Sequence, residues 1–145
     1  MSDASSIIRI ATALIMNPHG KILLVRKAGT TAFMQAGGKL DAGETARQAV
    51  VRELKEELSL QIEAESIDHI GSFRAPAANE PGWDVVADCF YVPCSTEVSP
   101  EAEIEEVLWI DSLSPPDIEL APLTRDHILP LAQKRLRDGA GDRLA

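Results

Sequence analysis

Three glutamates stand close together near the middle of the 145-residue sequence. Glu53, Glu56 and Glu57 follow one another at spacings of three and one, which places all three carboxylates on one face of an α-helix. Like charges so placed repel one another, at a cost of roughly 0.2–0.5 kcal/mol per pair on an exposed helix. A hard divalent cation with oxygen ligands removes this cost. Taken alone, such spacing is more typical of a solvated acidic face, and a cation site is the alternative that the neighbouring residues have to support.

The residues before these glutamates favour a ligand site over a plain acidic surface. Gly37 and Gly38 allow the backbone to approach a ligand closely, and Lys39 follows them in a position to meet a phosphate group. Arg52 directly precedes Glu53 and could orient the neighbouring carboxylates. Glycines, a lysine and clustered carboxylates together indicate chemistry on a metal-bound phosphate compound.

The carboxylates require a helix, and the sequence carries the signals for one. Thr45, followed three positions later by Gln48, has the form of a capping box. No glycine or proline interrupts the chain from there to Leu58. An apolar stripe recurs every four residues and predicts a buried face, formed by Ala46, Val50, Leu54 and Leu58.

Apolar runs on both sides of this helix predict strands. The runs 7–16 and 21–27 flank the turn sequence Asn17–Gly20, so they are expected to form a hairpin or neighbouring strands. In 84–92 the residues alternate, with Val86, Phe90 and Val92 on one face and Val85, Ala87 and Tyr91 on the other. Further strand-like segments lie in 62–73 and 105–110.

A closing helix is expected over 123–137, with Pro130 as a position where it kinks or splits. Strands around a central helix, followed by a terminal helix, predict an α/β fold in which helices pack on a mixed β-sheet. The expected domain spans 7–138, with tails at 1–6 and 139–145.

Composition excludes several classes of protein. The net charge is −9 and no basic stripe offsets it, which argues against long nucleic acid as a partner. The apolar run 7–16 is too short to span a bilayer and lacks the features of a signal peptide, so we expect a cytoplasmic protein without a membrane partner. Cys89 and Cys94 are expected to be reduced thiols.

The stretch 38–60 resembles the Nudix box, G-x5-E-x7-R-E-U-x-E-E-x-G-U, in which U is a bulky aliphatic residue. Eight positions fall at the required spacing: Gly38, Glu44, Arg52, Glu53, Leu54, Glu56, Glu57 and Leu60. The glycine and charged positions would coincide by chance in roughly one such chain in 10⁵. One position departs, because Ser59 replaces the second glycine. That glycine ends the helix in a left-handed conformation, which would cost a serine about 1 kcal/mol.

The resemblance implies a Nudix-type α/β/α sandwich and a Mg²⁺ or Mn²⁺ cofactor held against a diphosphate. It assigns Glu56, Glu57 and the Gly37 carbonyl as metal ligands, with Glu53 as a further ligand or the general base. Glu44 becomes an outer supporting carboxylate, and Arg52 orients Glu53 through a charge-assisted hydrogen bond.

The resemblance also assigns Arg26, Gly38 and Lys39 to substrate binding. A fourth carboxylate often comes from a late loop of the family, and the sequence does not choose among Glu103, Glu105 and Glu106. Candidates for stacking on a base are Phe33, Trp83 and Trp109, besides Phe90 and Tyr91, which are expected in packing.

The expected substrate is a small nucleotide. The length resembles MutT-type members, which favours a nucleoside triphosphate pyrophosphohydrolase. Pro76, sixteen positions after the box, stands where ADP-ribose hydrolases often have proline, so an ADP-ribose or nucleotide-sugar pyrophosphatase is the alternative. Where MutT proteins carry a base-reading asparagine, Thr124 is the nearest residue, which does not support specificity for oxidised guanine.

Two further alternatives remain. A nucleotide-sensing Nudix module without catalysis usually lacks part of the R-E-x-x-E-E core, which this chain keeps in full. A calcium-binding structural protein would be stabilised by Ca²⁺ and would hydrolyse no diphosphate. Many relatives pair as symmetric dimers, so a homodimer is compatible with each of the Nudix readings.

Overall fold

The computed structural model of the chain describes residues 6–144. Of the two expected tails, residues 1–5 and residue 145 lie outside this described part. A six-stranded mixed sheet forms the centre of the molecule, in the order β4-β5-β1-β2-β6, with β3 also paired to β1. The strands are β1 (Ile7–Met16), β2 (Ile22–Lys27), β3 (Gly37–Lys39), β4 (Asp68–Pro76), β5 (Asp84–Pro93) and β6 (Ile104–Ile110). Strands β1 and β5 run parallel, and the other pairs are antiparallel.

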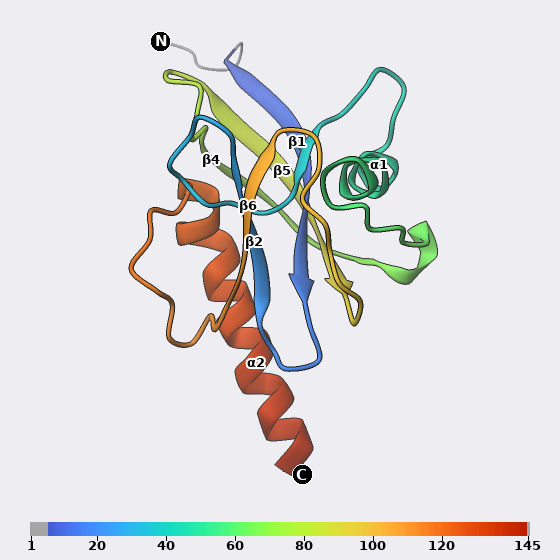
Figure 1. The fold of residues 1–145 in the computed structure, drawn as a ribbon, viewed down its shortest axis with the longest axis vertical. Helices are drawn as coiled ribbons and strands as arrows, with labels where there is room; N and C mark the ends of the chain where they lie inside the picture. Colours follow the sequence, from blue (N-terminus) through green and yellow to red (C-terminus); the bar gives the residue numbers. More distant parts are fainter. Residues whose placement is uncertain (1–5, 145) are drawn as a thin grey trace.

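Helices lie on both faces of this sheet, as Figure 1 shows. The α1 helix (Ala46–Leu58) packs on one face, and α2 (Leu129–Leu144) crosses the other. Two short elements complete the fold, the 3-10 turn η1 (Ala64–Ser66) and the π-helical segment η2 (Thr124–Ile128). Two separate apolar clusters fill the two interfaces, so the predicted α/β/α sandwich is confirmed.

Alternation along β5 assigns its side chains to the two layers. Phe90 and Val92 pack in the cluster beneath α1, whereas Ala87 and Cys89 pack beneath α2. This confirms the two faces predicted from the period-two pattern. Cys89 and Cys94 are both free, buried thiols, as expected, and burial raises the pKa of Cys89 to about 11.

The α1 helix begins as its sequence predicts. The Thr45 hydroxyl accepts a hydrogen bond from the Gln48 amide N–H at 3.1 Å, and the Gln48 side chain accepts one from the Thr45 N–H at 2.9 Å. This reciprocal capping box satisfies two of the N–H groups that an unassisted first turn would leave without partners. The apolar stripe is buried through Val50, Leu54 and Leu58, and Glu57 of the acidic side is buried as well.

The predicted closing helix is divided at its start. The π-helical segment η2 precedes α2, and Pro130 occupies the second position of α2. The helical backbone runs on from η2 into α2, and the wider π-helical turn directly precedes the proline, which lacks an N–H and whose ring would crowd the preceding turn of a regular α-helix. Pro130 therefore marks a division, and α2 continues to Leu144, beyond the expected end at Arg137.

Strands β1 and β2 separate instead of forming a continuous hairpin ladder. They pair only at Met16 and Ile22, next to their turn. The segment 33–39 fills the gap between them: Met34 exchanges backbone hydrogen bonds with Val25 of β2, and Ala36 accepts one from Ala13 of β1. The chain that carries the glycine-rich loop is thus inserted into the centre of the sheet.

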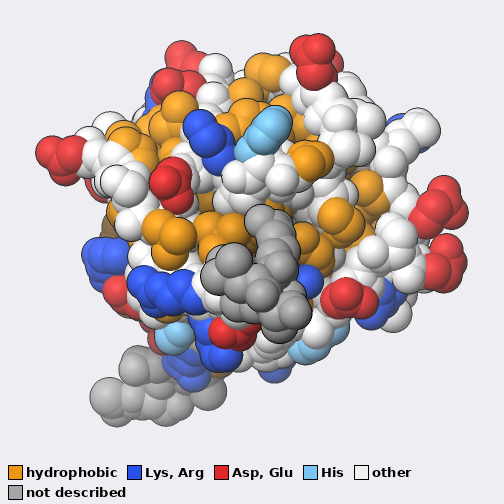
Figure 2. Space-filling view, turned by 90° about the horizontal axis from the view of Figure 1, so that it is seen from below, with side chains coloured by type: hydrophobic (Ala, Val, Ile, Leu, Met, Phe, Trp, Pro, Cys, Tyr) orange, Lys and Arg blue, Asp and Glu red, His pale blue; other side chains and the backbone are white. Residues whose placement is uncertain are grey.

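The end of the molecule that faces downward in Figure 1 carries mixed charges. Figure 2 shows acidic and basic side chains interspersed with apolar ones on this face, without a continuous basic stripe. Among the described residues, neither helix combines the length and the apolar composition needed to cross a bilayer.

Gly37 is the position on which the inserted segment depends most. Its φ of +143° is rarely adopted by other residues, and a Cβ there would overlap the carbonyl oxygen of Ala11 on β1. We expect Gly37→Ala to lower the free energy of unfolding by at least about 3 kcal/mol, measured by urea denaturation. Gly29→Ala is the matched control, because φ is +79° there but no atom lies within 4 Å of the added Cβ. The control is expected to cost about 1–2 kcal/mol, and equal losses in both variants would contradict the packing argument.

Candidate active site

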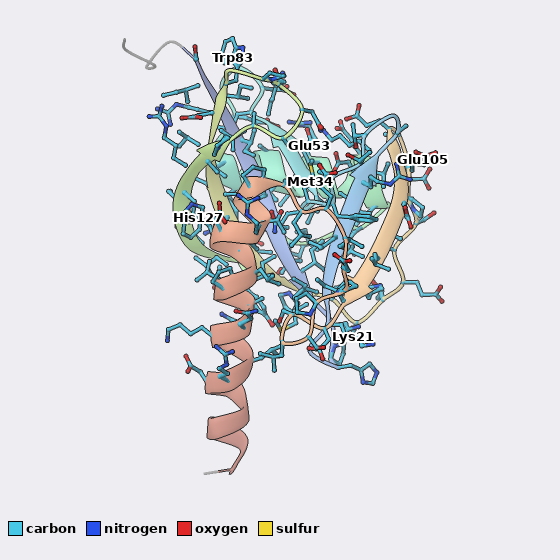
Figure 3. The ribbon with its side chains drawn as sticks, turned by 90° about the vertical axis from the view of Figure 1, so that its left-hand side faces the viewer. Lys21, Met34, Glu53, Trp83, Glu105 and His127 are labelled. Carbon is cyan, nitrogen blue, oxygen red and sulfur yellow. The ribbon has the colours of Figure 1, made fainter. Side chains whose placement is uncertain are left out.

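A cavity of about 500 Å³ opens where β1, the inserted segment and α1 meet. Both helical layers contribute to its wall, since Glu53 of α1 and Thr124 of η2 line the same space. Figure 3 shows Met34 and Glu53 close together in the middle of the molecule, while Lys21 lies at the far end, at the β1–β2 turn.

The cavity wall is strongly acidic. Its charged lining consists of five glutamates and two lysines: Glu53, Glu56, Glu57, Glu80 and Glu103, with Lys27 and Lys39. A polyphosphate carries negative charge and would be repelled by this surface unless divalent cations accompanied it. The charge balance therefore selects either a cation alone or an anion bound together with cations.

Glu57 is the most deeply buried of these carboxylates. Only 5% of the residue is exposed, and one carboxylate oxygen accepts a hydrogen bond from the Gly37 N–H at 3.0 Å. Burial raises the pKa of Glu57 to about 7, and the backbone hydrogen bond opposes this effect only in part. Among the described residues, no lysine or arginine forms a salt bridge with this buried carboxyl group.

Glu53 lies one turn earlier on the same side of α1. Burial also raises the pKa of this carboxyl, and the nearby Arg52 guanidinium opposes the rise. Gly38 packs directly against it, because a Cβ at this position would come within 2.6 Å of the Glu53 Oε2. The absence of a side chain at Gly38 therefore leaves room for the carboxylate beside the loop.

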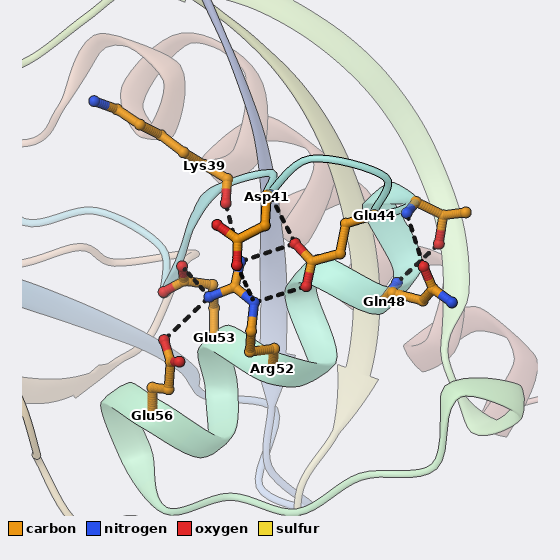
Figure 4. Close-up of polar contacts among 8 residues, drawn as sticks. Lys39, Asp41, Glu44, Gln48, Arg52, Glu53 and Glu56 are labelled. Atoms are coloured by element: carbon orange, nitrogen blue, oxygen red, sulfur yellow. Dashed lines mark hydrogen bonds and ion pairs between the residues drawn. The ribbon is translucent and has the colours of Figure 1, made fainter.

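Arg52 organises the acidic groups around α1 (Figure 4). Its guanidinium donates to both carboxylate oxygens of Glu44, at 2.7 and 3.0 Å, and to the Lys39 carbonyl oxygen at 3.1 Å. It also donates to Glu53 at 3.0 Å and to Glu56 at 3.1 Å. One cation thereby joins the box helix to the loop before it.

The pKa of Glu44 is shifted in the opposite direction to that of Glu57. The hydrogen bonds from Arg52, together with one from the Asp41 N–H, lower the pKa of Glu44 from 4.5 to about 2. Its carboxylate therefore stays ionised at any physiological pH.

Within the described part of the chain, no three His, Cys, Asp or Glu side chains form a ready-made metal cage. Arg52 explains this, because it draws the Glu53 and Glu56 carboxylates to itself, while Glu57 is turned to Gly37. The donor set nevertheless fits a hard divalent cation: all of the candidate ligands are oxygens, and among the described residues the buried Glu57 carboxylate forms no salt bridge.

The two basic side chains expected near the substrate, Lys39 and Arg26, lie in different surroundings. Lys39 is two-thirds exposed at the cavity and lies 3.9 Å from Glu80 of the β4–β5 loop. Arg26 instead pairs with Glu105 and Glu106 on β6, at 3.0 and 3.1 Å, and does not line the cavity. A register shift between Arg26 and the next residue turns Lys27 to the cavity in its place.

The ion pairs of Arg26 and Lys27 also distinguish the three late carboxylates among which the sequence did not choose a fourth metal ligand. Glu103 lines the cavity beside Lys27, whose Nζ lies 3.0 Å away. Glu105 and Glu106 are turned to Arg26. Glu103 is thus the late-loop residue that faces the box carboxylates.

Sequence reasoning missed Gln35. This residue is only 5% exposed, lines the cavity, and accepts a hydrogen bond from the Thr124 hydroxyl at 3.0 Å. Its amide nitrogen is buried without a hydrogen-bond partner among the described residues, as is the Thr12 hydroxyl in the same wall. A glutamine two positions before the first of two glycines gave no signal, although a buried amide in an apolar segment is uncommon.

The expected stacking residues do not take part. None of the aromatic candidates lines the cavity, including Phe33, which packs under α2, and Trp83, which lies on the exposed β4–β5 loop (Figure 3). The apolar part of the wall is aliphatic and comes from Ile8, Ile10, Met34, Val85 and Leu123.

Comparisons with known proteins agree with this arrangement. The chain is 43% identical over 58 residues to an 8-oxo-dGTP diphosphatase of Haemophilus influenzae, and 39% identical over 57 residues to that of Escherichia coli. Each match covers 37% of this chain, and it spans 43% and 44% of the two relatives, less than half of either.

The crystal structure of a MutT protein from Methanosarcina mazei superposes with a TM-score of 0.70 at 22% identity, covering 92% of this chain and 95% of that one. This likeness concerns the fold. The model of the NUDIX domain matches residues 7–131, which include the sheet, α1 and the whole cavity wall. Because that match covers most of its length, the chain belongs to the NUDIX family.

Proposed function

We propose that the chain is a metal-dependent hydrolase that cleaves a phosphoanhydride bond of a nucleoside triphosphate and releases pyrophosphate. The observation that carries this proposal is the buried Glu57 carboxylate on the Gly37 amide, within a cavity that also holds a buried, unpartnered amide. The first feature suits a cation with its phosphates, and the second suits the polar edge of a base.

Mg²⁺ or Mn²⁺ fits the oxygen donors of Glu53, Glu56, Glu57 and the Gly37 carbonyl, with Glu103 as a further candidate from the late loop. Such an ion, when bound, neutralises the phosphate charge and stabilises the leaving group. The protein's own part is to hold the carboxylates in one place before substrate arrives, since positioning and electrostatics supply most of the acceleration in such reactions.

Arg52 and Glu44 have a positioning role and act through the Glu53 carboxylate. The guanidinium fixes the Glu53 carboxylate, and Glu44 fixes the guanidinium through two hydrogen bonds. Glu53 is the residue that we assign to take the proton from the attacking water, because its carboxylate lies against the Gly38 loop at the cavity and partial burial raises its pKa. Lys39 and Lys27, with the Gly38 backbone, are the groups at the cavity that can meet phosphate oxygens.

A second candidate is an ADP-ribose or nucleotide-sugar pyrophosphatase. The observation that favours it is Pro76, which ends β4 and lines the cavity. The relatives named above are 8-oxo-dGTP diphosphatases. In this chain Thr124 is the residue nearest to where MutT proteins carry a base-reading asparagine, so oxidised guanine is one member of the panel to be tested and not the expected preference.

The deciding experiment is a nucleotide panel with Mg²⁺ or Mn²⁺ and product identification by mass. Hydrolysis of a nucleoside triphosphate to the monophosphate and pyrophosphate supports the proposal. Sugar phosphates from ADP-ribose or nucleotide sugars support the second candidate. Nucleotide binding without any product would indicate a sensing module, and stabilisation by Ca²⁺ without hydrolysis would indicate a structural role.

Removing the charge of Glu57 tests the metal site. We expect Glu57→Gln to lower turnover at saturating substrate by about a hundredfold or more, and to weaken Mn²⁺ uptake measured by calorimetry. The fold should persist, because the amide oxygen of glutamine can still accept the Gly37 hydrogen bond. Glu65→Gln, an exposed change in η1, is the control. A folded Glu57→Gln protein with wild-type turnover would refute the ligand assignment.

Glu44 provides a test by pH. Its folded pKa of about 2 lies below the ordinary 4.5, so its contribution to stability is full above pH 4.5 and is lost as the pH falls toward 2. Glu44→Gln should therefore be less stable than the wild type at pH 7, and the difference should shrink between pH 4.5 and 2. Urea unfolding across this range measures it, with Glu63→Gln as an exposed control. A difference that is independent of pH would show that the Arg52 pairing is not its source.

The buried amide of Gln35 tests base recognition. Gln35→Met keeps the length of the side chain and removes its hydrogen bonds, so kcat/KM for the preferred base should fall about tenfold to a hundredfold and the spread among bases should narrow. Thr124→Val, which leaves Gln35 without its partner, should act in the same direction. Gln61→Met, at an exposed position, is the control. An unchanged order of preference in Gln35→Met would exclude this amide from base recognition.

A further inference from the structure

The α1 helix ends on the one position that departs from the box. Ser59 has φ 54° and ψ 32°, the left-handed conformation that glycine adopts more readily, and its N–H bonds back to the Leu54 and Lys55 carbonyls. A cap of this kind needs only backbone atoms, so glycine would serve it better. The serine hydroxyl must therefore be judged by what else it contacts.

That hydroxyl reaches a loop more than forty residues away in sequence. Ser59 Oγ donates to the Glu101 Oε2 at 3.1 Å, and Ser99 Oγ donates to the same oxygen at 3.1 Å. We call these three side chains the hydroxyl clip. Both hydrogen bonds end on a charged acceptor, which makes them stronger than bonds between neutral groups.

Backbone hydrogen bonds place the same loop against the last turn of α1. The Ser99 N–H donates to the Leu58 carbonyl at 3.0 Å, and the Glu101 N–H donates to the Glu57 carbonyl at 2.8 Å. These carbonyls belong to the last turn, which has no intrahelical donors for them. The loop is thus attached to the backbone of Glu57 itself, and the hydroxyl clip lies beside that attachment.

The loop then turns sharply toward the cavity. Ala102 has φ 54°, a left-handed conformation that a residue with a Cβ keeps only where its surroundings enforce it. Glu103 follows at once and lines the cavity with Glu57. The direction of the Glu103 side chain therefore depends on both ends of this turn: the Ala28 N–H and the Lys27 Nζ hold Glu103 itself, and the hydroxyl clip holds Glu101 at the start.

We propose that Ser59 is a positioning residue: through Glu101, its hydroxyl holds the 99–103 turn so that Glu103 faces the metal-binding carboxylates of α1. This inference rests on the proposed function, because it gives Glu103 a cation to meet. It also explains why serine stands at this position: glycine would cap the helix better, but it has no hydroxyl to hold the 99–103 loop.

Ser59→Gly separates the two roles of the residue. If Ser59 were only a helix cap, the Ser59→Gly change should raise the free energy of unfolding and leave cation binding unchanged. The proposal expects stability at or above that of the wild type, together with Mn²⁺ binding weakened about threefold to tenfold in calorimetry without nucleotide, and faster amide hydrogen exchange in 99–103. Glu101→Ala should likewise weaken Mn²⁺ binding and speed exchange in 99–103, and the double variant should show little more than Glu101→Ala alone, because Ser59 acts only through Glu101. Ser95→Gly, a serine of the same loop outside the clip, is the control.

Each outcome decides a different point. Wild-type Mn²⁺ affinity in a stable Ser59→Gly protein would overturn the proposal, and so would unchanged hydrogen exchange in 99–103. Additive losses in the double variant would also overturn it, since the two residues would then act separately. A wild-type protein that takes up no Mn²⁺, even with a non-hydrolysable nucleotide present, would instead refute the proposed function, while the exchange measurement would still show whether Ser59 holds the turn.

Discussion

A buried carboxylate on a backbone amide is the interaction on which the site depends. Glu57 lies on α1 and Gly37 lies on the inserted segment, so their hydrogen bond joins the helix to the centre of the sheet. The bond needs close approach of two backbones, which Gly37 permits because it has no Cβ to meet Ala11. The same closeness removes water from the carboxylate, and this is why its pKa lies near 7. The close approach of Gly37 to α1 therefore both joins the helix to the sheet and raises the pKa of Glu57.

Arg52 supplies the complementary constraint. It gathers Glu44, Glu53 and Glu56, and so holds negative charge near α1 without a bound cation. The result is two carboxyl groups of opposite character within one stretch of the chain: hydrogen bonds hold Glu44 ionised, whereas burial raises the pKa of Glu57. Environments that separate the pKa values of neighbouring acids are typical of catalytic sites, because they allow one group to stay charged while another responds to its surroundings.

The sequence predicted those parts of the molecule that local patterns determine. Helix α1, its capping box and the two faces of β5 follow from periodicity and from residues within four positions of one another, whereas the α/β/α sandwich is expected from the resemblance to the Nudix box. The separation of β1 from β2 could not be predicted, because residues 33–39 join the sheet through long-range backbone bonds with no side-chain signature. Gln35 with Thr124, and Ser59 with Glu101, are pairs of distant polar residues, and only the fold shows that they meet.

The inserted segment also links the two kinds of recognition that the proposed reaction requires. Gln35 and Gly37 are two residues apart on it, and hydrogen bonds to Ala13, Val25 and Ala121 hold the segment on three sides. A base bound at the Gln35 amide and a phosphate bound near Gly37 would therefore be placed by one rigid piece of backbone. Reaction rates depend steeply on such placement, since a displacement of about 1 Å can cost a hundredfold. A base that fits poorly at Gln35 should then misplace the phosphates, so selectivity would arise in the chemical step as well as in binding.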